Sequence, residues 1–265
     1  MLTNYTIQKT DFKFADVGTI LWQNTESSSA LQVKISDAIF PGHDNTHKEA
    51  LEESWRILAA RAESNLPSGD TFKFYNSEIL KWQRFDLNTN TIFVEKSMYY
   101  KDITAVRSQQ AVYDQIPTAE RPSAFVLMNI LITADNKIVL GRRPYFGDWP
   151  HDRYECPGSF LKEKHVTKSS LEDVAKSRVW DDYQNQPPLE TKPLLICDLP
   201  RVMETMLLYE THTTCTAQEL QSDFYTNLLT VENSPAGFEH LQALPLDQFH
   251  PPSRVMLQAY FESIV

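Results

Sequence analysis

The stretch GSFLKEKHVTKSSLEDVAKSRVWDDYQ, which runs from Gly158 to Gln184, directly follows Cys156-Pro157. It reads as a loop that leads into a helix, and the helix ends in two adjacent acids, Asp181 and Asp182. Because helix positions i, i+3 and i+4 share a face, residues 178, 181 and 182 form a triplet suited to gathering a cation. The pattern therefore raises the possibility of a metal site at the end of this helix.

Arg178 is the first member of that triplet, and it places a positive charge where a metal ligand is needed. Mg²⁺ takes hard oxygen ligands at roughly 2.1 Å in an octahedron, so several carboxylates must converge to hold it. The favoured alternative is an ion pair between Arg178 and either Asp181 or Asp182. A metal site would have to recruit further carboxylates, for which the candidates are Glu155, Glu163, Asp173 and Glu210.

In the second half of the chain, apolar segments that predict strands lie before and after the stretch 158–184. Residues 124–133 form a nearly continuous apolar run, which is typical of a strand buried on both faces. Asp135-Asn136 predicts a turn into a second strand at 137–141, and Arg142-Arg143 follow it. Further strands are predicted near 194–197 and 206–211, and a closing helix over 254–264.

The first 121 residues are predicted to form an α+β segment of their own. Alternation in 31–35 predicts a strand, a capping box opens a helix over 46–64, and 80–85 with 91–95 predict a hairpin. The stretch Thr118-Ala-Glu-Arg-Pro122 is the expected boundary. We therefore divide the chain into residues 1–121 and residues 122–265.

Composition and charge limit the classes of function. The 265 residues include 25 Lys and Arg against 35 Asp and Glu, a net charge of −10, so a nucleic-acid-binding surface is not expected. Three cysteines without CxxC spacing indicate neither a disulfide framework nor a zinc cage, and they fit a reducing compartment. No apolar run approaches the roughly 18 residues that a membrane helix needs. We expect a cytoplasmic protein with a small-molecule partner, no nucleic acid and no membrane; the oligomeric state is left open.

From residue 122 onward the chain resembles the Nudix hydrolase family. The family signature is a glycine, five residues, Glu, seven residues, and then Arg-Glu-apolar-any-Glu-Glu-any-Gly. Ser177-Arg-Val-Trp-Asp-Asp-Tyr-Gln184 lies on the second half of that signature, with Asp181 and Asp182 on its paired glutamates. Arg178 stands where the first glutamate of that half is expected. The box is therefore degenerate, and the other departures from it are Ser169, Ser177 and Gln184.

The order of segments in the first half is similar to that in the UDP-glucose pyrophosphatase branch of the family. The segments that carry this likeness are 47–55, 71–75 and 97–102. The residues that precede the box, 138–143 and 154–158, are also placed as in the family. The resemblance implies an α/β fold, a Nudix-like α/β/α sandwich with a mixed sheet over 122–265, on which the N-terminal α+β segment packs.

The resemblance also implies roles for individual residues. Asp181 and Asp182 would hold Mg²⁺ or Mn²⁺ and serve as the catalytic acids. Arg142 or Arg143 would bind a diphosphate; the alternative is that one of them lies on the surface and the other forms a salt bridge. Gly158 would let the backbone approach the substrate. Two functions stay open. One is a metal-dependent pyrophosphohydrolase of nucleoside diphosphate-linked compounds, with UDP-glucose suggested; the other is a catalytically inactive Nudix-like module that binds a nucleotide or a protein.

Overall fold

The computed structural model describes residues 18–24, 31–36, 52–53, 55–57, 60, 77–99, 103, 123–143, 153–183, 188–200 and 202–264. The strands are β1 (Thr19–Gln23), β2 (Gln32–Ser36), β3 (Glu78–Asp86), β4 (Thr91–Tyr99), β5 (Ala124–Ile132), β6 (Lys137–Arg142), β7 (Tyr154–Glu155), β8 (Gly158–Phe160), β9 (Pro188–Leu199), β10 (Glu204–Thr213) and β11 (Asn227–Glu232). The helices are α4 (Glu163–Thr167), α5 (Leu171–Asp182), α6 (Pro235–Ala243) and α7 (Pro251–Ile264).

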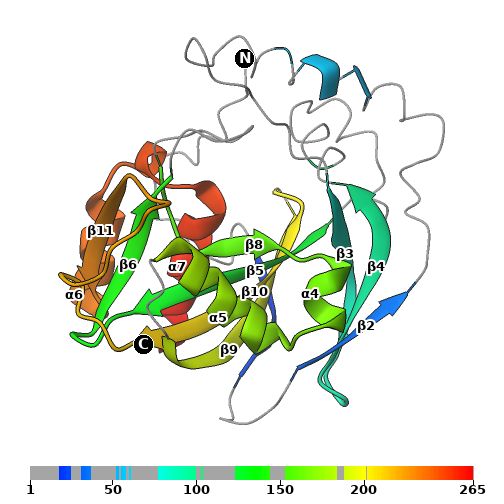
Figure 1. Ribbon diagram of the computed structural model, residues 1–265, viewed down its shortest axis with the longest axis horizontal. Helices are drawn as coiled ribbons and strands as arrows, with labels where there is room; N and C mark the ends of the chain where they lie inside the picture. The colour runs from blue at the N-terminus through cyan, green and yellow to red at the C-terminus, as the bar shows by residue number, and fades with distance from the viewer. Residues whose placement is uncertain are drawn as a thin grey trace.

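The described strands form one mixed sheet of eleven strands (Figure 1). Its main path is β1-β9-β10-β5-β3-β4-β2, and β6, β7, β8 and β11 join it at the side. β10 runs parallel to β5, whereas β9 pairs antiparallel with β10 and β3 pairs antiparallel with β5. Strands from the first 121 residues thus share a sheet with those that follow. The boundary at 118–122 lies outside the described residues, so the division into two domains stays a prediction.

Helices cover the two faces of this sheet, and β5 packs against both. All nine β5 residues are buried, and because side chains alternate along a strand they divide between the faces. Val126, Met128 and Ile130 belong to the core that contains α7, whereas Phe125 and Leu127 belong to the core that contains α5. Figure 1 shows α5 and α7 on opposite sides of the strands. The predicted class, an α/β fold with a mixed sheet between helices, is confirmed.

Most individual elements follow the sequence patterns. The strand at 31–35, the hairpin at 80–95, the strand pair at 124–141 and the closing helix are confirmed. Asn136 adopts φ 57° in the turn after β5, the left-handed conformation that asparagine tolerates. Of the predicted helix 46–64 the structure describes 52–53, 55–57 and 60, which are helical. The segment 71–75 lies outside the described residues. No helix among those described is long and apolar enough to cross a membrane.

The segment 249–253, which leads into α7 and forms its first residues, holds β7 in place. The His250 N–H donates to the Tyr154 carbonyl at 2.9 Å, and the Cys156 N–H donates to the Ser253 hydroxyl at 3.1 Å. The rings of Tyr154 and Phe249 lie 6.3 Å apart between the same two segments. Because buried backbone groups need partners, these bonds fix the short strand against the helix. The position of Glu155 within β7 is thereby set by α7.

Replacing Ser253 by Ala should destabilise the protein. Ser253 is 0% exposed, and its loss leaves the buried Cys156 N–H without its acceptor. We expect the free energy of unfolding, measured by urea titration, to fall by about 1–3 kcal/mol. Thr167→Ala removes an exposed hydroxyl that bonds the Glu163 carbonyl, and it serves as the control with an expected change below about 0.5 kcal/mol. Equal stability of the two variants would contradict a tether through Ser253.

Candidate functional site

The face that α5 turns toward the core decides which of the two adjacent acids, Asp181 or Asp182, is buried. Ser170 caps the helix, since its hydroxyl accepts from the Asp173 N–H at 3.1 Å and the Asp173 carboxylate accepts from the Ser170 N–H. The buried residues of the helix lie on one face, and they are Leu171, Ala175, Val179 and Asp182. Asp182 is consequently only 1% exposed, whereas Asp181 faces solvent.

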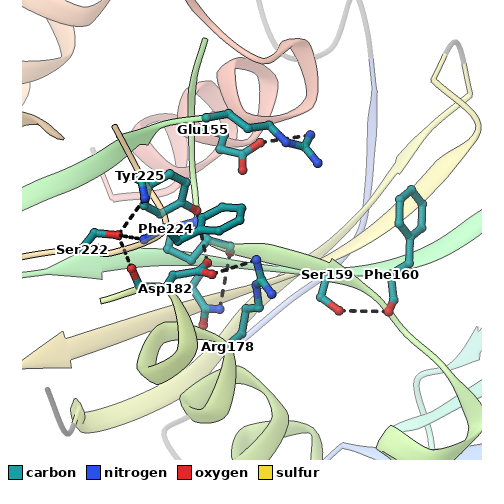
Figure 2. Close-up of polar contacts among 11 residues, drawn as sticks. Glu155, Ser159, Phe160, Arg178, Asp182, Ser222, Phe224 and Tyr225 are labelled. Carbon is teal, nitrogen blue, oxygen red and sulfur yellow. Dashed lines mark hydrogen bonds and ion pairs between the residues drawn. The ribbon is translucent and has the colours of Figure 1, made fainter. Parts of the chain in front are cut away.

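Asp182 is neutralised from within its own helix. Nη2 of Arg178 lies 2.8 Å from Oδ1 of Asp182, an i,i+4 ion pair, and Figure 2 shows the two side chains pointing toward each other. The Tyr225 hydroxyl donates to the other carboxylate oxygen at 3.2 Å. Of the two partners that the sequence leaves open for Arg178, the structure gives Asp182. Both oxygens of this buried carboxylate are therefore engaged.

A turn between β10 and β11 covers the end of α5. The Ser222 hydroxyl donates to the Asp182 carbonyl, and it accepts from the N–H groups of Phe224 at 3.1 Å and Tyr225 at 2.9 Å (Figure 2). The Arg178 guanidinium lies 5.7 Å from the centre of the Phe224 ring. Carbonyls at a helix end need such partners. The same turn thus satisfies the backbone of α5 and shields its acid.

Gly141 in β6 leaves room for Tyr225. A Cβ atom added at Gly141 would lie 2.1 Å from Cγ of the Tyr225 ring, far inside van der Waals contact. The Tyr225 ring also packs on that of Tyr183, with centroids 5.4 Å apart. A glycine inside a strand commonly marks the close approach of another group. Here that group is the ring whose hydroxyl binds Asp182.

Arg143 pairs with the second buried acid, Glu155. Glu155 lies in β7 opposite Gly141, it is 8% exposed, and its Oε2 is 3.4 Å from Nη1 of Arg143. Arg142 is half-buried, with its guanidinium 5.8 Å from the centre of the Tyr154 ring. The salt-bridge alternative therefore holds for Arg143. Whether Arg142 or Arg143 grips a diphosphate stays a prediction.

Both buried acids have pKa values above their ordinary range. Burial raises the pKa of Glu155 to about 7, against the nearby Arg143, and the charge of Asp182 raises it further. Burial likewise raises the pKa of Asp182 to about 6, although the Arg178 guanidinium and the Tyr225 hydroxyl oppose the change. Each of the two buried acids is therefore paired with a partly exposed arginine.

This arrangement does not fit a Mg²⁺ ion. Each buried carboxylate already has an arginine, and no three His, Cys, Asp or Glu side chains gather to hold a metal among the residues that the structure describes. The other candidates for recruitment are engaged elsewhere: Glu163 pairs with Lys96, Asp173 caps α5, and Glu210 pairs with Lys192 and His212. A metal-binding and catalytic role of Asp181 and Asp182 thus stays a prediction without support from these contacts.

Gly158 lies in β8 opposite Met128 of β5. A Cβ atom added there would lie 3.1 Å from the Leu127 carbonyl oxygen, so the glycine permits close contact between two strands. Its suggested contact with a substrate stays a prediction. Sequence reasoning missed the contributions of Ser222 and Tyr225, because nothing in the spacing relates that turn to α5. The one signal was Gly141, a glycine within an apolar strand.

Solved structures whose chains follow a similar course include Nudix proteins. One is a bifunctional NMN adenylyltransferase/ADP ribose pyrophosphatase from Francisella tularensis, complexed with AMP and a manganese ion (TM-score 0.38, 11% identity, 58% of this chain and 44% of that chain). A second is the MutT protein from Methanosarcina mazei Go1, with a TM-score of 0.39, 12% identity, and coverage of 54% of this chain and 95% of that chain. A third is the NUDIX domain of Shewanella oneidensis NrtR complexed with ADP ribose, with a TM-score of 0.32, 14% identity, and coverage of 58% of this chain and 96% of that chain.

The matched part spans less than half the length of the Francisella chain. No family model matches the sequence, and no curated protein matches it. At 11–14% identity the overlaps with these three structures concern the course of the chain and not the side chains of the site.

The two buried acids should make stability depend on pH. Their folded-state pKa values, about 7 for Glu155 and about 6 for Asp182, exceed the ordinary 4.5 and 3.8. Their contribution is therefore fully present below the ordinary values and is lost as pH rises through 6 and 7. Glu155→Gln should reduce the fall in unfolding free energy between about pH 5 and about pH 8 by about 2 kcal/mol, measured by urea titration.

The control for this pH dependence is Glu219→Gln. Hydrogen bonds from the Thr216 backbone and hydroxyl lower the pKa of the exposed Glu219 carboxyl. Its contribution is therefore lost only as pH falls below the ordinary range of glutamate. In this variant the free energy of unfolding should change between about pH 5 and about pH 8 by the same amount as in the native protein. An unaltered change in Glu155→Gln would show that Glu155 does not titrate as described.

Gly141→Ala should displace Tyr225 and destabilise the protein by about 3 kcal/mol, since overpacking forces neighbouring groups to move. Urea titration measures the loss. In a Tyr225→Ala background the ring is gone, so the further cost of Gly141→Ala should nearly vanish. If Gly141→Ala lowers the free energy of unfolding equally in both backgrounds, the added methyl group clashes with a group other than the Tyr225 ring.

Proposed function

We propose that the chain is a Nudix-like module that binds a nucleoside diphosphate-linked small molecule and does not cleave it through a metal ion at α5. The ion pair between Arg178 and Asp182, at 2.8 Å, is the observation that carries this proposal. The position where the family resemblance expects a ligand carboxylate holds the cation that neutralises Asp182. Since an opposite charge in contact cancels most of the field of a buried acid, little attraction remains for Mg²⁺.

The ligand class rests on the sequence resemblance over residues 122–265 and on Arg142. Arg142 is half-buried and ends β6, and an arginine fork suits the oxygens of a diphosphate. The order of segments in the first half suggests a UDP-sugar such as UDP-glucose. Recognition of the diphosphate would then come from guanidinium groups and backbone, without a bridging metal ion.

A second candidate function is Mg²⁺-dependent hydrolysis of the same compounds. It is favoured by the presence of two buried acids from different elements, Glu155 and Asp182, both with raised pKa values, and the charge of Asp182 contributes to the shift of Glu155. Asp181 lies beside them on the exposed side of α5. In this scheme Arg178 must leave Asp182 before a metal ion can bind to the two aspartates. Breaking a buried pair is costly, which is why we rank this function second.

Ligand-induced stabilisation and product analysis separate the two functions. The purified chain is mixed with UDP-glucose and related nucleoside diphosphates in Mg²⁺, Mn²⁺ or EDTA, and its melting temperature is measured. We expect one of these ligands to raise the melting temperature equally in all three conditions, by the equivalent of about 3 kcal/mol at a hundredfold excess over Kd. Chromatography should then detect no UMP and no sugar phosphate.

Metal-dependent release of UMP would instead establish the hydrolase, provided that Asp182→Asn abolishes it. Asp181→Asn is the matched variant on the exposed side of the same helix, and it tells whether both aspartates take part. If none of the ligands raises the melting temperature of the folded protein, the nucleotide-binding proposal is rejected.

A further inference from the structure

A row of three polar side chains crosses the neighbouring strands β11, β6 and β7. Asn227 of β11 lies opposite Arg142 of β6, and Arg142 lies opposite Tyr154 of β7. Residues that lie directly opposite each other in a sheet project to the same face. The amide, the guanidinium and the phenol are therefore side by side on one face, and we call these three residues the β6 row.

The β6 row lies on the face of the sheet that is turned away from the buried acids. Side chains alternate along a strand, so Arg142 projects to the same side as Leu140, which belongs to the core that contains α7. Gly141 projects to the other side, where Glu155 lies opposite it and pairs with Arg143. The two adjacent arginines therefore serve different faces of the sheet.

Contacts across the β6 row hold its polar groups together. The Asn227 amide donates to the Tyr154 hydroxyl at 3.4 Å, although β6 runs between their two strands. The Arg142 guanidinium lies 5.8 Å from the centre of the Tyr154 ring. That ring packs on the fully buried Phe249, with centroids 6.3 Å apart. The spacing of the three groups is thus set by paired strands and by the core beneath them.

The β6 row can reach a ligand and carries donors that suit an anion. Asn227 is exposed, and Arg142 and Tyr154 are half-buried. A guanidinium fork binds phosphate oxygens in pairs, and an amide and a phenol each add a neutral donor. Because the Tyr154 hydroxyl accepts from Asn227, it can donate its own proton to a third group. One cation with two neutral donors is a suitable set for a diphosphate.

We infer that the β6 row binds the diphosphate of the ligand, with Arg142 on the phosphate oxygens and Tyr154 and Asn227 as neutral donors. The inference rests on the proposed function for the class of ligand. It selects Arg142 over Arg143, and it adds two residues that determine affinity. It also places the diphosphate on the α7 side of the sheet, away from Asp182.

Inorganic pyrophosphate is the probe, because it carries the diphosphate without a base or a sugar. Binding of pyrophosphate and of UDP in EDTA is measured by isothermal titration calorimetry. We expect both to bind the native protein and to compete with each other. Arg142→Gln should raise both Kd values at least about tenfold, since it removes a charge-assisted pair of hydrogen bonds. Tyr154→Phe removes only the hydroxyl and should raise them by roughly threefold to tenfold.

Two aspartate substitutions in β11 form a matched pair. Asn227→Asp keeps the shape of the side chain, removes its N–H donors and adds a charge that repels phosphate. It should weaken pyrophosphate binding at least about tenfold. Thr230→Asp adds the same charge at an exposed position on the opposite face of β11, where Thr230 pairs with Val139. Its Kd should stay within about twofold of the native value, because solvent screens exposed charges.

Unchanged binding in Arg142→Gln or Asn227→Asp would overturn the inference and leave the proposed function standing, since the native protein would still bind UDP. Equal weakening by Asn227→Asp and Thr230→Asp would also overturn it, because net charge alone would then explain the loss. If the native protein binds neither UDP nor any other nucleoside diphosphate, the proposed function is rejected and the inference with it. If Arg142→Gln does not fold, the matched pair in β11 decides.

Discussion

The ion pair between Arg178 and Asp182 is the interaction on which the rest of the site depends. An acid at 1% exposure needs a partner, and the face of α5 that carries Leu171, Ala175 and Val179 inward carries Asp182 with them. Arg178 lies one turn earlier on the same side of the helix, so a single helical turn supplies both charges. The Tyr225 ring completes the enclosure, and it fits only because residue 141 is a glycine.

Much of the fold follows from local patterns, because burial on both faces of β5 makes its sequence continuously apolar and the hairpins carry their own turn residues. The helix at α5 and its two adjacent acids were also predictable, because both are features of the local sequence. The turn that covers them was not, since Tyr225 lies 43 residues beyond Asp182 and reaches it through tertiary packing alone. Glu155 was a candidate among four, and only the pairing of β7 with β6 distinguishes it.

The pairing of Asp182 with Arg178 bears on how a protein with this architecture could do without a metal ion. A divalent ion and a guanidinium both supply positive charge to buried carboxylates, but the guanidinium adds directed N–H donors and is covalently part of the chain. Its contribution therefore does not vary with the supply of metal in the surroundings. What it does not provide is the Lewis acidity with which a metal ion activates water.

The continuity of the sheet has a consequence for how the chain folds. Thr19 of β1 lies opposite Asp198 of β9, and β3 joins β5 through a single residue pair, Lys81 with Ala124. Contacts between residues so distant in sequence close late and slow the folding reaction. During synthesis from the N-terminus, β1 cannot pair until β9 has been made. Two apolar side chains of β1, Ile20 and Leu21, are exposed even in the folded sheet. Association with other chains competes with folding during that interval.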